Sequence, residues 1–454
     1  TRDKEGAWIM EYRYREQKEL IKGELGNIPK SWNQAKAQYY FDVFAGGTPS
    51  TNEPKYWDGD IPWINSGEVQ NCYITNVSRY ITNQGLKESS TKLIPKNTTV
   101  LAMTGATCGN VGYLQFDSTA NQSVMAFVPK YSYNSKFLYY YLMCQSQQIE
   151  YYKTGGAQGG INVDNGKKLY INIPLDEEQE KIANFLDKKT SKFNSIISKK
   201  EALIEKLEEA KKSLISEVVT GKMKVIKNDD GYDLVKRSND EMKDSGVEWL
   251  GEIPKDWEVN KLSNIAELTR LAGAEYTSYW ETDDDGEIIA LRGQNIGINE
   301  LNLNNIERIS SKLSNRLNRS KLYKGDIVFP CVGSIGKATL IKEDNKYHIN
   351  QNIAKITHND KIVPELLSYL LNSNECHKQI TWFNSSQMQP SVLIRDLRQF
   401  KFALSYDKLE QVEICEFLEL KLHYMNKILN NTKNQIQKLK EAKQSLISEA
   451  VTGK

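Results

Sequence analysis

Two stretches of this chain have the pattern of a long amphipathic helix, in which apolar positions recur every three or four residues on a strongly charged background. The first stretch spans residues 176–222, and the second spans residues 407–454. This spacing places the apolar side chains on one stripe flanked by Glu and Lys, which is typical of a helix that packs against a partner helix. We therefore predict that the two long helices pack against each other.

The predicted seam between the two helices is broken by polar residues at Lys200 in the first helix and at Thr432 and Gln435 in the second. An alternative is that each helix packs against its own globular region and not against the other helix. The predicted seam positions are Phe193, Ile196, Leu203, Leu207, Ala210, Leu214, Met425, Ile428, Leu439, Ala442 and Leu446.

The two helices end in nearly the same sixteen residues, LEEAKKSLISEVVTGK from Leu207 and LKEAKQSLISEAVTGK from Leu439, which share thirteen identities. A second pair of segments, LGNIPKSW from Leu25 and LGEIPKDW from Leu250, shares six identities in eight positions. The members of the two pairs are 232 and 225 residues apart, far beyond the period of about 20–50 residues of solenoid repeats. The chain therefore contains two homologous halves.

Each half contains short alternating runs, such as VGYLQF and KATLIKE, that predict short β-strands separated by Gly and Asn turns. Helical stretches lie among these runs, so the expected fold class is α+β. We predict two homologous α+β domains, residues 1–175 and 249–406, that form an internal pseudo-twofold repeat with the two long helices. The charged, turn-rich segment 223–248 is expected to be a linker into the second half.

Composition favours a soluble protein, because the mean hydropathy is −0.58 and no apolar run approaches the roughly 18 residues needed to cross a bilayer. Six cysteines are dispersed along the chain without a CxxC pair, and the first residues lack the apolar core of a signal peptide. A cytoplasmic location is expected. The formal net charge is only +2, so any nucleic-acid binding must come from local patches.

A search for catalytic motifs gives no enzyme assignment. The chain has no GxxxxGK[ST] or GxGxxG phosphate loop, no GxSxG nucleophile motif and no HExxH, and its four histidines are far apart in sequence. The Asn-Pro-Pro-aromatic and Asp-Pro-Pro-aromatic tetrapeptides of amino-methyltransferases are also missing. We expect no catalytic residue, no cofactor and no metal ion on this chain itself.

Two similar domains on a pair of helices suit a ligand with two parts. Duplex DNA offers half-sites about one helical turn, or 34 Å, apart. A helix of about 30 residues spans about 45 Å, which is of the same order.

The order of these segments resembles that of the DNA specificity subunits of type I restriction-modification systems. The resemblance rests on LGEIPKDW, VGSIGKATL, IPLDEEQEKIANFLD beside LEQVEICEFLE, and the two LISE-V-TGK ends, and it covers essentially the whole chain. The second helix departs from the pattern, because it opens with LSYDKLEQVE and has no proline there. Residues 1–24 also match poorly the segment that precedes Leu250.

The resemblance implies that each α+β domain is a target recognition domain that binds one part of a split double-stranded DNA sequence. The long helices would then be conserved antiparallel coiled-coil spacers that set the gap between the two parts and dock the methyltransferase subunits. The chain would have no catalysis of its own, and it would assemble with two methyltransferase subunits and with restriction subunits. S-adenosylmethionine, ATP and Mg²⁺ are expected on those partner subunits.

Side chains with paired donors and acceptors are the candidates for base recognition, and Lys, Ser and Thr are candidates for phosphate contacts. Aligned turns in the two halves, INSGEVQ and LRGQNIG, carry different polar side chains, as two domains with different target sequences would. A second aligned pair is the GAT and GSIGK turns, and a third is the loops TGGAQGGIN and NSSQMQPS; ordinary polar turns are the alternative explanation. The candidates are Asn65, Ser66, Glu68, Thr107, Thr154, Gln158, Arg292, Gln294, Asn295, Ser334, Lys337, Ser385, Ser386, Gln387 and Gln389.

Two other functions are compatible with parts of the pattern. A coiled-coil adaptor or structural protein would use the helices to dimerise and the globular halves to bind proteins, without recognising a DNA sequence. A stand-alone modification enzyme would transfer methyl groups without partner subunits, but the missing motifs argue against it.

Overall fold

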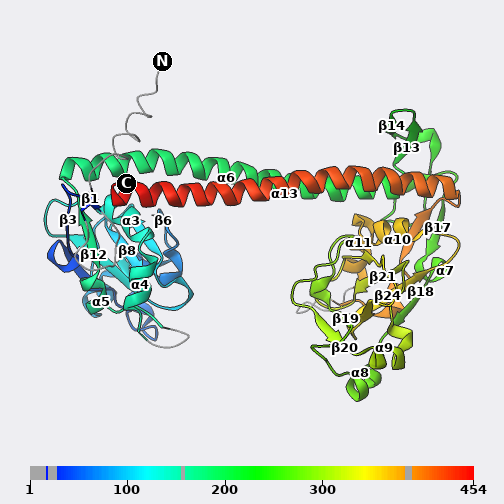
Figure 1. Cartoon of the computed structure of the whole chain (residues 1–454), viewed down its shortest axis with the longest axis horizontal. Helices are drawn as coiled ribbons and strands as arrows, with labels where there is room; N and C mark the ends of the chain where they lie inside the picture. The colour runs from blue at the N-terminus through cyan, green and yellow to red at the C-terminus, as the bar shows by residue number, and fades with distance from the viewer. Residues whose placement is uncertain (1–16, 19–27, 155–158, 384–390) are drawn as a thin grey trace. The chain divides into compact units, whose positions relative to one another are not determined.

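The computed structural model describes residues 17–18, 28–154, 159–383 and 391–454. It divides into two compact units, residues 1–200 with 434–454 (unit 1) and residues 201–433 (unit 2). This division differs from the predicted boundaries, in which the two spacer helices stand apart from the domains. Both long helices are instead shared, because each unit contains the start of one helix and the end of the other (Figure 1).

Unit 1 is an α+β domain built around a five-stranded sheet with the order β4-β11-β8-β9-β6. A three-stranded sheet, β10-β5-β7, and the pairs β12-β3 and β1-β2 complete its strands. Its elements up to the first long helix are β1 (Gln17–Lys18), β2 (Ile28–Pro29), β3 (Asn33–Lys36), η1 (Ala37–Tyr39), β4 (Phe41–Ala45), η2 (Pro54–Tyr56), β5 (Trp57–Ile64), η3 (Ser66–Glu68), β6 (Cys72–Ile74), β7 (Arg79–Ile81), α2 (Asn83–Lys87), β8 (Thr99–Ala102), η4 (Gly105–Thr107), β9 (Val111–Leu114), β10 (Thr119–Ala120), β11 (Val124–Pro129), α3 (Ser135–Met143), α4 (Ser146–Tyr152), α5 (Val163–Lys168) and β12 (Tyr170–Ile173).

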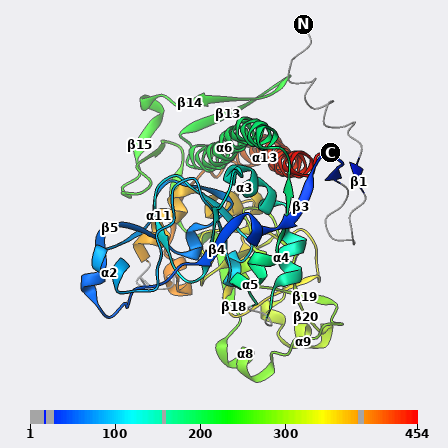
Figure 2. The same ribbon diagram turned by 90° about the vertical axis from the view of Figure 1, so that its left-hand side faces the viewer.

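The helix α3 joins the five-stranded sheet of unit 1 to the first long helix, α6 (Asp176–Val219) (Figure 2). Nearly all of α3 is apolar or aromatic, and Phe137, Leu138 and Tyr141 are fully buried. Asn134 caps the helix by accepting hydrogen bonds from the backbone N–H groups of residues 136 and 137. The cap starts α3 at the point where its aromatic face meets the sheet.

Unit 2 repeats this plan with a four-stranded sheet, β18-β24-β21-β22, and a three-stranded sheet, β20-β19-β23. Two-stranded sheets are formed by β17 and β25, β13 and β14, and β15 and β16. Its elements are β13 (Met223–Asn228), β14 (Gly231–Lys236), η5 (Asn239–Glu241), β15 (Met242–Asp244), β16 (Glu252–Pro254), β17 (Glu258–Lys261), α7 (Leu262–Ile265), β18 (Ala266–Arg270), α8 (Gly273–Tyr279), β19 (Ile288–Leu291), η6 (Gly293–Asn295), β20 (Glu307–Ile309), α9 (Ser311–Arg316), η7 (Asn318–Ser320), β21 (Asp326–Pro330), β22 (Thr339–Leu340), β23 (Tyr347–Ile349), β24 (Ile353–His358), α10 (Pro364–Leu371), α11 (Asn374–Phe383), α12 (Ile394–Leu397), β25 (Lys401–Leu404) and the second long helix, α13 (Lys408–Thr452).

The segment expected to be a plain linker, 223–248, is largely structured. Its first part forms the antiparallel hairpin β13–β14, in which Val225 pairs with Leu234. Val225 is buried, and Tyr232 and Leu234 pack against the core of unit 2, so one face of the hairpin is apolar. This segment folds as strands because apolar residues alternate with charged ones along it. The many Lys and Asp residues made this alternation hard to recognise in the sequence.

The contact between a tryptophan and a glutamate fixes the start of each long helix. In unit 1, the Nε1 of Trp32 donates a 3.1 Å hydrogen bond to the Oε2 of Glu178 in the first turn of α6. In unit 2, the Nε1 of Trp257 donates a 3.1 Å hydrogen bond to the Oε2 of Glu410 in the first turn of α13. The two tryptophans end the repeated LGxIPKxW segments, which explains why both halves retain that segment.

The same segments also receive the end of the other long helix. Gly221, which follows the C-terminus of α6, has a φ of +73° and lies against Pro254 and Trp257. Gly453, which follows the C-terminus of α13, has a φ of +72° and lies against Pro29. A Cβ at either glycine would overlap the proline, so both the left-handed backbone and the close packing at each helix end require glycine.

The predicted seam is wrong at five positions. Ile196 and Leu203 are 44% and 43% exposed, whereas Ile197, one residue further, is buried. The inward stripe of α6 passes through Ile197, Lys200, Ile204, Leu207, Lys211 and Leu214, still at spacings of three and four. The exposed predicted positions are Ile196, Leu203, Ala210, Ile428 and Ala442, and the partly buried ones are Phe193, Leu207, Leu214, Met425, Leu439 and Leu446.

Polar pairs join the two long helices within each unit. In unit 1, Lys200 donates to Gln435 over 2.6 Å and Lys443 donates to Asn194 over 2.8 Å, so the helices run antiparallel there. In unit 2, the Nζ of Lys211 donates to the Oδ1 of Asn426 over 2.7 Å. Burial, with Lys440 nearby, lowers the pKa of Lys443. Asn194 and Asn426 are 232 residues apart, as are Lys211 and Lys443, so one contact is made twice.

Within the described part of the chain, the search for a helix that is both long and apolar enough to span a membrane gives no result.

We expect Gly221→Ala to lower the free energy of unfolding by about 2 kcal/mol or more, because alanine at a left-handed φ is strained and its Cβ would overlap Pro254. Urea unfolding monitored by circular dichroism measures the change. Gly273→Ala is the matched control, since Gly273 has no atom within 4 Å of a built Cβ and no positive φ. Equal effects of the two variants would contradict the packing role of Gly221.

We expect Asn426→Leu to cost about 1–3 kcal/mol of stability, because it removes the oxygen that accepts from the largely buried Lys211, whose side chain is 12% exposed. Adding Lys211→Met to this variant should recover most of the loss, since an apolar pair then fills the same position. A double-mutant cycle by chemical denaturation measures the coupling. If the stability losses of the two single variants simply add in the double variant, Lys211 and Asn426 are not energetically coupled.

Candidate nucleic-acid interface

The first pair of candidate turns has the same structure in both units. In unit 1, Asn65 accepts from the N–H of Gly67 over 2.8 Å, and its own N–H donates to the Oε2 of Glu68 over 2.9 Å. The other carboxylate oxygen of Glu68 accepts from the N–H of Ser78 over 2.7 Å. Both Asn65 and Glu68 therefore hold the turn at η3, whereas the half-buried side chain of Ser66 makes no hydrogen bond in it.

In unit 2, Asn295 occupies the position of Glu68 and closes the turn at η6. Its Oδ1 accepts from the N–H of Arg292 over 3.0 Å, and its Nδ2 donates to the backbone oxygen of Asn302 over 2.9 Å. Arg292 in turn donates to Glu307 over 2.7 Å and to the backbone oxygen of Asn305 over 2.5 Å. The prediction of Asn295 as a base contact is wrong, because its side chain is fully buried.

Gln294 is the polar side chain of this turn that remains exposed. It makes only a long hydrogen bond, 3.4 Å, from its Nε2 to the backbone oxygen of Asn305. Arg292 is half-buried, and its ion pair with Glu307 would have to break before its guanidinium could bind a base. Ser66 in unit 1 and Gln294 in unit 2 are therefore the side chains that these turns offer to a ligand.

The second pair of candidate turns lies after the strands β8 and β21. Ser334 and Lys337 are exposed, and their side chains form no hydrogen bond or ion pair with the described residues. Thr107 is half-buried, with its hydroxyl 3.4 Å from the backbone oxygen of Thr104. Gly336, with a φ of +83°, lies directly over the ring of His377. Burial, with Lys212 nearby, lowers the pKa of His377, whose ring lies beneath this turn.

The third pair of candidate loops lies beside the second pair. In unit 1, the N–H of Ile161 donates to the backbone oxygen of Met103 over 3.0 Å, and Thr154 pairs with Gly160 across the loop. In unit 2, the N–H of Val392 donates to the backbone oxygen of Cys331 over 2.9 Å. Thr154 is exposed. The candidates Gln158, Ser385, Ser386, Gln387 and Gln389 lie outside the described residues.

The three predicted loops thus gather around the end of one central strand. In unit 2, a Cβ at Gly293 would lie 3.8 Å from both Pro330 and Val332, so the first turn adjoins the second as well. In unit 1, the side chain of Asn71 bridges to Asn110 and to the N–H of Val111 next to the second turn. The candidates come from segments far apart in sequence, and the structure brings them to the same end of each domain.

Sequence reasoning missed two exposed aromatic residues that precede the third loop. Tyr151, near the end of α4, is 71% exposed, and Trp382, near the end of α11, is 67% exposed. They are 231 residues apart and stand three positions before Thr154 and Ser385, the aligned first candidates of this loop. The alignment of the two halves could have found them, since both halves place a large aromatic residue at this position.

The arrangement suits binding and not bond-making chemistry. It offers hydroxyl, amide and ammonium groups together with aromatic faces, which are the groups that contact phosphates and base edges. Among the described residues, no group of three or more His, Cys, Asp and Glu side chains could hold a metal ion.

Comparison with known proteins places this geometry in a family. The family model for the type I restriction modification DNA specificity domain matches residues 29–206 and 254–438, one match in each half. The specificity subunit of the type I restriction enzyme MjaIX from Methanocaldococcus jannaschii is 34% identical over 180 residues, which are 38% of this chain and 41% of that protein.

Two further relatives show how far the similarity extends. The EcoR124I/EcoR124II specificity subunit from Escherichia coli is 31% identical over 154 residues, or 32% of this chain and 37% of that protein. The chain thus aligns with about two fifths of the length of these two relatives. The MjaVIII specificity subunit from Methanocaldococcus jannaschii is 22% identical over 437 residues, 94% of this chain and 93% of that protein.

A solved structure supports the fold. A chain from a study of complex assembly and conformational transition of the type I R-M system superposes with a TM-score of 0.68 at 13% identity, over 94% of this chain and 99% of that chain. With two family matches that together cover more than half of its residues, this chain belongs to the type I restriction modification DNA specificity domain family.

Proposed function

We propose that this chain is the DNA specificity subunit of a type I restriction-modification complex, in which each unit recognises one part of a bipartite double-stranded target. The observation that carries the proposal is the recurrence of three loops at the same end of both domains with different side chains on the same scaffold. Ser66 stands where unit 2 has Gly293, and Gln294 stands where unit 1 has Gly67. One scaffold with two sets of side chains suits two different half-sites.

Some of the exposed groups suit phosphate contacts, which position the protein on DNA, and others suit base contacts, which recognise its sequence. The ammonium of Lys337 and the hydroxyls of Ser334 and Thr107 suit phosphate oxygens, which fix the protein on the duplex without recognising bases. The amide of Gln294 can donate and accept at once, the pattern that distinguishes adenine in the major groove. The hydrogen bonds of Asn65, Asn295 and their neighbours would keep these groups in place.

The chain in this proposal is a non-catalytic cytoplasmic subunit. Its paired long helices would dock two methyltransferase subunits, which would bind S-adenosylmethionine, and it would also assemble with restriction subunits, which would use ATP and Mg²⁺. The names of its relatives, all specificity subunits of type I restriction enzymes, support this assignment. Methylome sequencing of cells that carry this chain with the methyltransferase subunit tests it, and we expect a two-part methylated motif. Methylation without sequence preference would contradict the proposal.

We expect Gln294→Ala to relax recognition in only one half of that motif, because the side chain belongs to unit 2 alone. Loss of a good base contact costs about 1–3 kcal/mol of discrimination. Ser66→Ala, at the same turn of unit 1, should alter the other half. Methylome sequencing of each variant measures both effects, and a change spread over both halves by either variant would contradict the assignment of one unit to one half-site.

We expect Tyr151→Ala and Trp382→Ala to weaken DNA binding by the methyltransferase complex about fivefold or more, because each removes an exposed aromatic face beside a candidate loop. Fluorescence anisotropy with a duplex that carries the mapped motif measures the affinity. Tyr131→Ala is the matched control, since Tyr131 is 70% exposed but precedes α3, away from these loops. Equal affinity of the Tyr131 and Tyr151 variants would remove Tyr151 from the interface.

A further inference from the structure

Unit 2 contains a cavity of about 550 Å³ between α13, α10 and the loops around residues 298–300, 324–325 and 340–342. Ser368, Tyr369 and Cys415 lie at its buried side, and Glu365 and Glu419 line it with exposed carboxylates. All of its lining residues belong to unit 2. The cavity is distinct from the candidate DNA-binding loops, since none of their predicted residues lines it.

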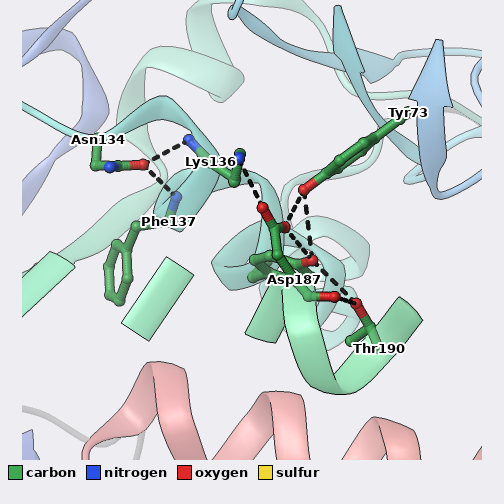
Figure 3. Close-up of polar contacts among 7 residues, drawn as sticks. Tyr73, Asn134, Lys136, Phe137, Asp187 and Thr190 are labelled. Atoms are coloured by element: carbon green, nitrogen blue, oxygen red, sulfur yellow. Dashed lines mark hydrogen bonds and ion pairs between the residues drawn. The ribbon is translucent and has the colours of Figure 1, made fainter. Parts of the chain in front are cut away.

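At the corresponding place in unit 1, several side chains donate hydrogen bonds to one carboxylate, that of Asp187 (Figure 3). Asp187 of α6 accepts from the Nζ of Lys136 over 2.6 Å and from the hydroxyl of Tyr140 over 2.7 Å. Tyr73 donates to the same carboxylate. Tyr139 packs edge to face against Tyr140, so aromatic rings occupy the rest of the space.

The two places correspond residue by residue. Glu419 follows Asp187 by the same 232 residues that separate the two long helices, and Tyr369 stands in α10 where Tyr140 stands in α3. Glu365 replaces Lys136, and Ser368 replaces Tyr139. Unit 2 has thus kept the tyrosine and the carboxylate, but it has lost the cation and the ring that fill the space in unit 1.

The groups left in unit 2 have no bonding partners. Within the described ranges, no hydrogen bond or ion pair is formed by the side chains of Glu365, Glu419 or Tyr369, although Tyr369 is only 8% exposed. Burial raises the pKa of Tyr369, and Cys415, Glu419 and Glu365 raise it further. The cavity therefore presents two exposed carboxylates and the hydroxyl of a largely buried tyrosine, none of which has a partner among the described residues.

The positive groups that line the cavity do not fill this role. Lys211 already donates to Asn426, and Lys324 and Lys342 form no ion pair with Glu365 or Glu419 within 4.0 Å among the residues described. A metal ion is also unsuited, because no described cluster offers three ligands. An ammonium at the end of a flexible aliphatic arm matches both the charge and the shape that Lys136 supplies in unit 1.

We propose that this cavity is a docking site for a lysine side chain of the methyltransferase subunit, which would complete in unit 2 the contact that Lys136 makes within unit 1. The identity of the partner rests on the proposed function. The cavity lies along α13, one of the two helices to which that function assigns subunit docking, and its unpaired carboxylates are complementary to a cation. The lysine would donate to Glu419 and Glu365, and Tyr369 would donate to Glu419.

Two variants separate this role from a structural one. We expect Glu419→Gln to weaken binding of the methyltransferase subunit about tenfold or more, without loss of stability, because Glu419 has no partner in the free chain. Glu365→Lys should create within unit 2 the contact that Lys136 makes within unit 1. It should therefore raise the unfolding midpoint and also weaken binding of the methyltransferase subunit. Glu205→Gln, at an exposed carboxylate of α6 outside the cavity, is the control and should leave binding unchanged.

The test uses the full chain with its methyltransferase subunit. Surface plasmon resonance measures binding, thermal unfolding measures stability, and carbodiimide cross-linking with mass spectrometry should join Glu365 or Glu419 to a lysine of that subunit. Cross-links only to Lys324 or Lys342, or unchanged binding of both variants, would overturn the inference while a two-part methylated motif still supports the function. A different outcome is that added spermidine raises the unfolding midpoint of the wild-type chain but not of the Glu419→Gln variant, while binding of the methyltransferase subunit is unchanged in that variant. This outcome would assign the cavity to a free amine and would also overturn the inference. A wild-type chain that binds no methyltransferase subunit would overturn both proposals.

Discussion

The hydrogen bond between a motif tryptophan and a helix-start glutamate is the constraint on which the rest of the structure depends. Trp32 and Trp257 each fix the first turn of one long helix, and the same segments receive Gly453 and Gly221 at the end of the other. In each unit, one segment therefore fixes the start of one long helix and the end of the other. A change in the length of either helix cannot be absorbed at these ends without breaking a buried contact.

The same scaffold carries two different chemistries because only its framework contacts are repeated. The tryptophan–glutamate bond and the lysine–asparagine pair occur once in each unit at corresponding positions. The turns at η3 and η6 also share their backbone geometry, yet Glu68 closes one and Asn295 closes the other. Residues that hold the backbone are thus separated from residues that face outward, so the outward side chains can differ without cost to the fold.

The repeat, the fold class and the helix ends could be predicted from the sequence, because they rest on long segments and on glycine signals. The seam could not be placed, since Ile196 and Ile197 are both apolar and either one fits a spacing of three and four. The stripe that faces inward also includes Lys200, whose alkyl chain packs while its ammonium reaches Gln435. In the candidate site, Asn295 was mistaken for a base contact because polar turn residues serve both to cap and to bind. Trp382 was missed because the solvent exposure of a side chain cannot be predicted from a single sequence.

The sharing of the long helices between the units also bears on how the chain folds during synthesis. Asn172 donates to the backbone oxygen of Val451, a residue 279 positions later, and Ile447 and Val451 belong to the hydrophobic core of unit 1. Unit 1 therefore lacks part of its core until residues 447–451 have been made. The main core of unit 2 is formed by residues between Leu214 and Met425, so it can close before that of unit 1. The usual order, in which the N-terminal domain is completed first, is reversed in this chain.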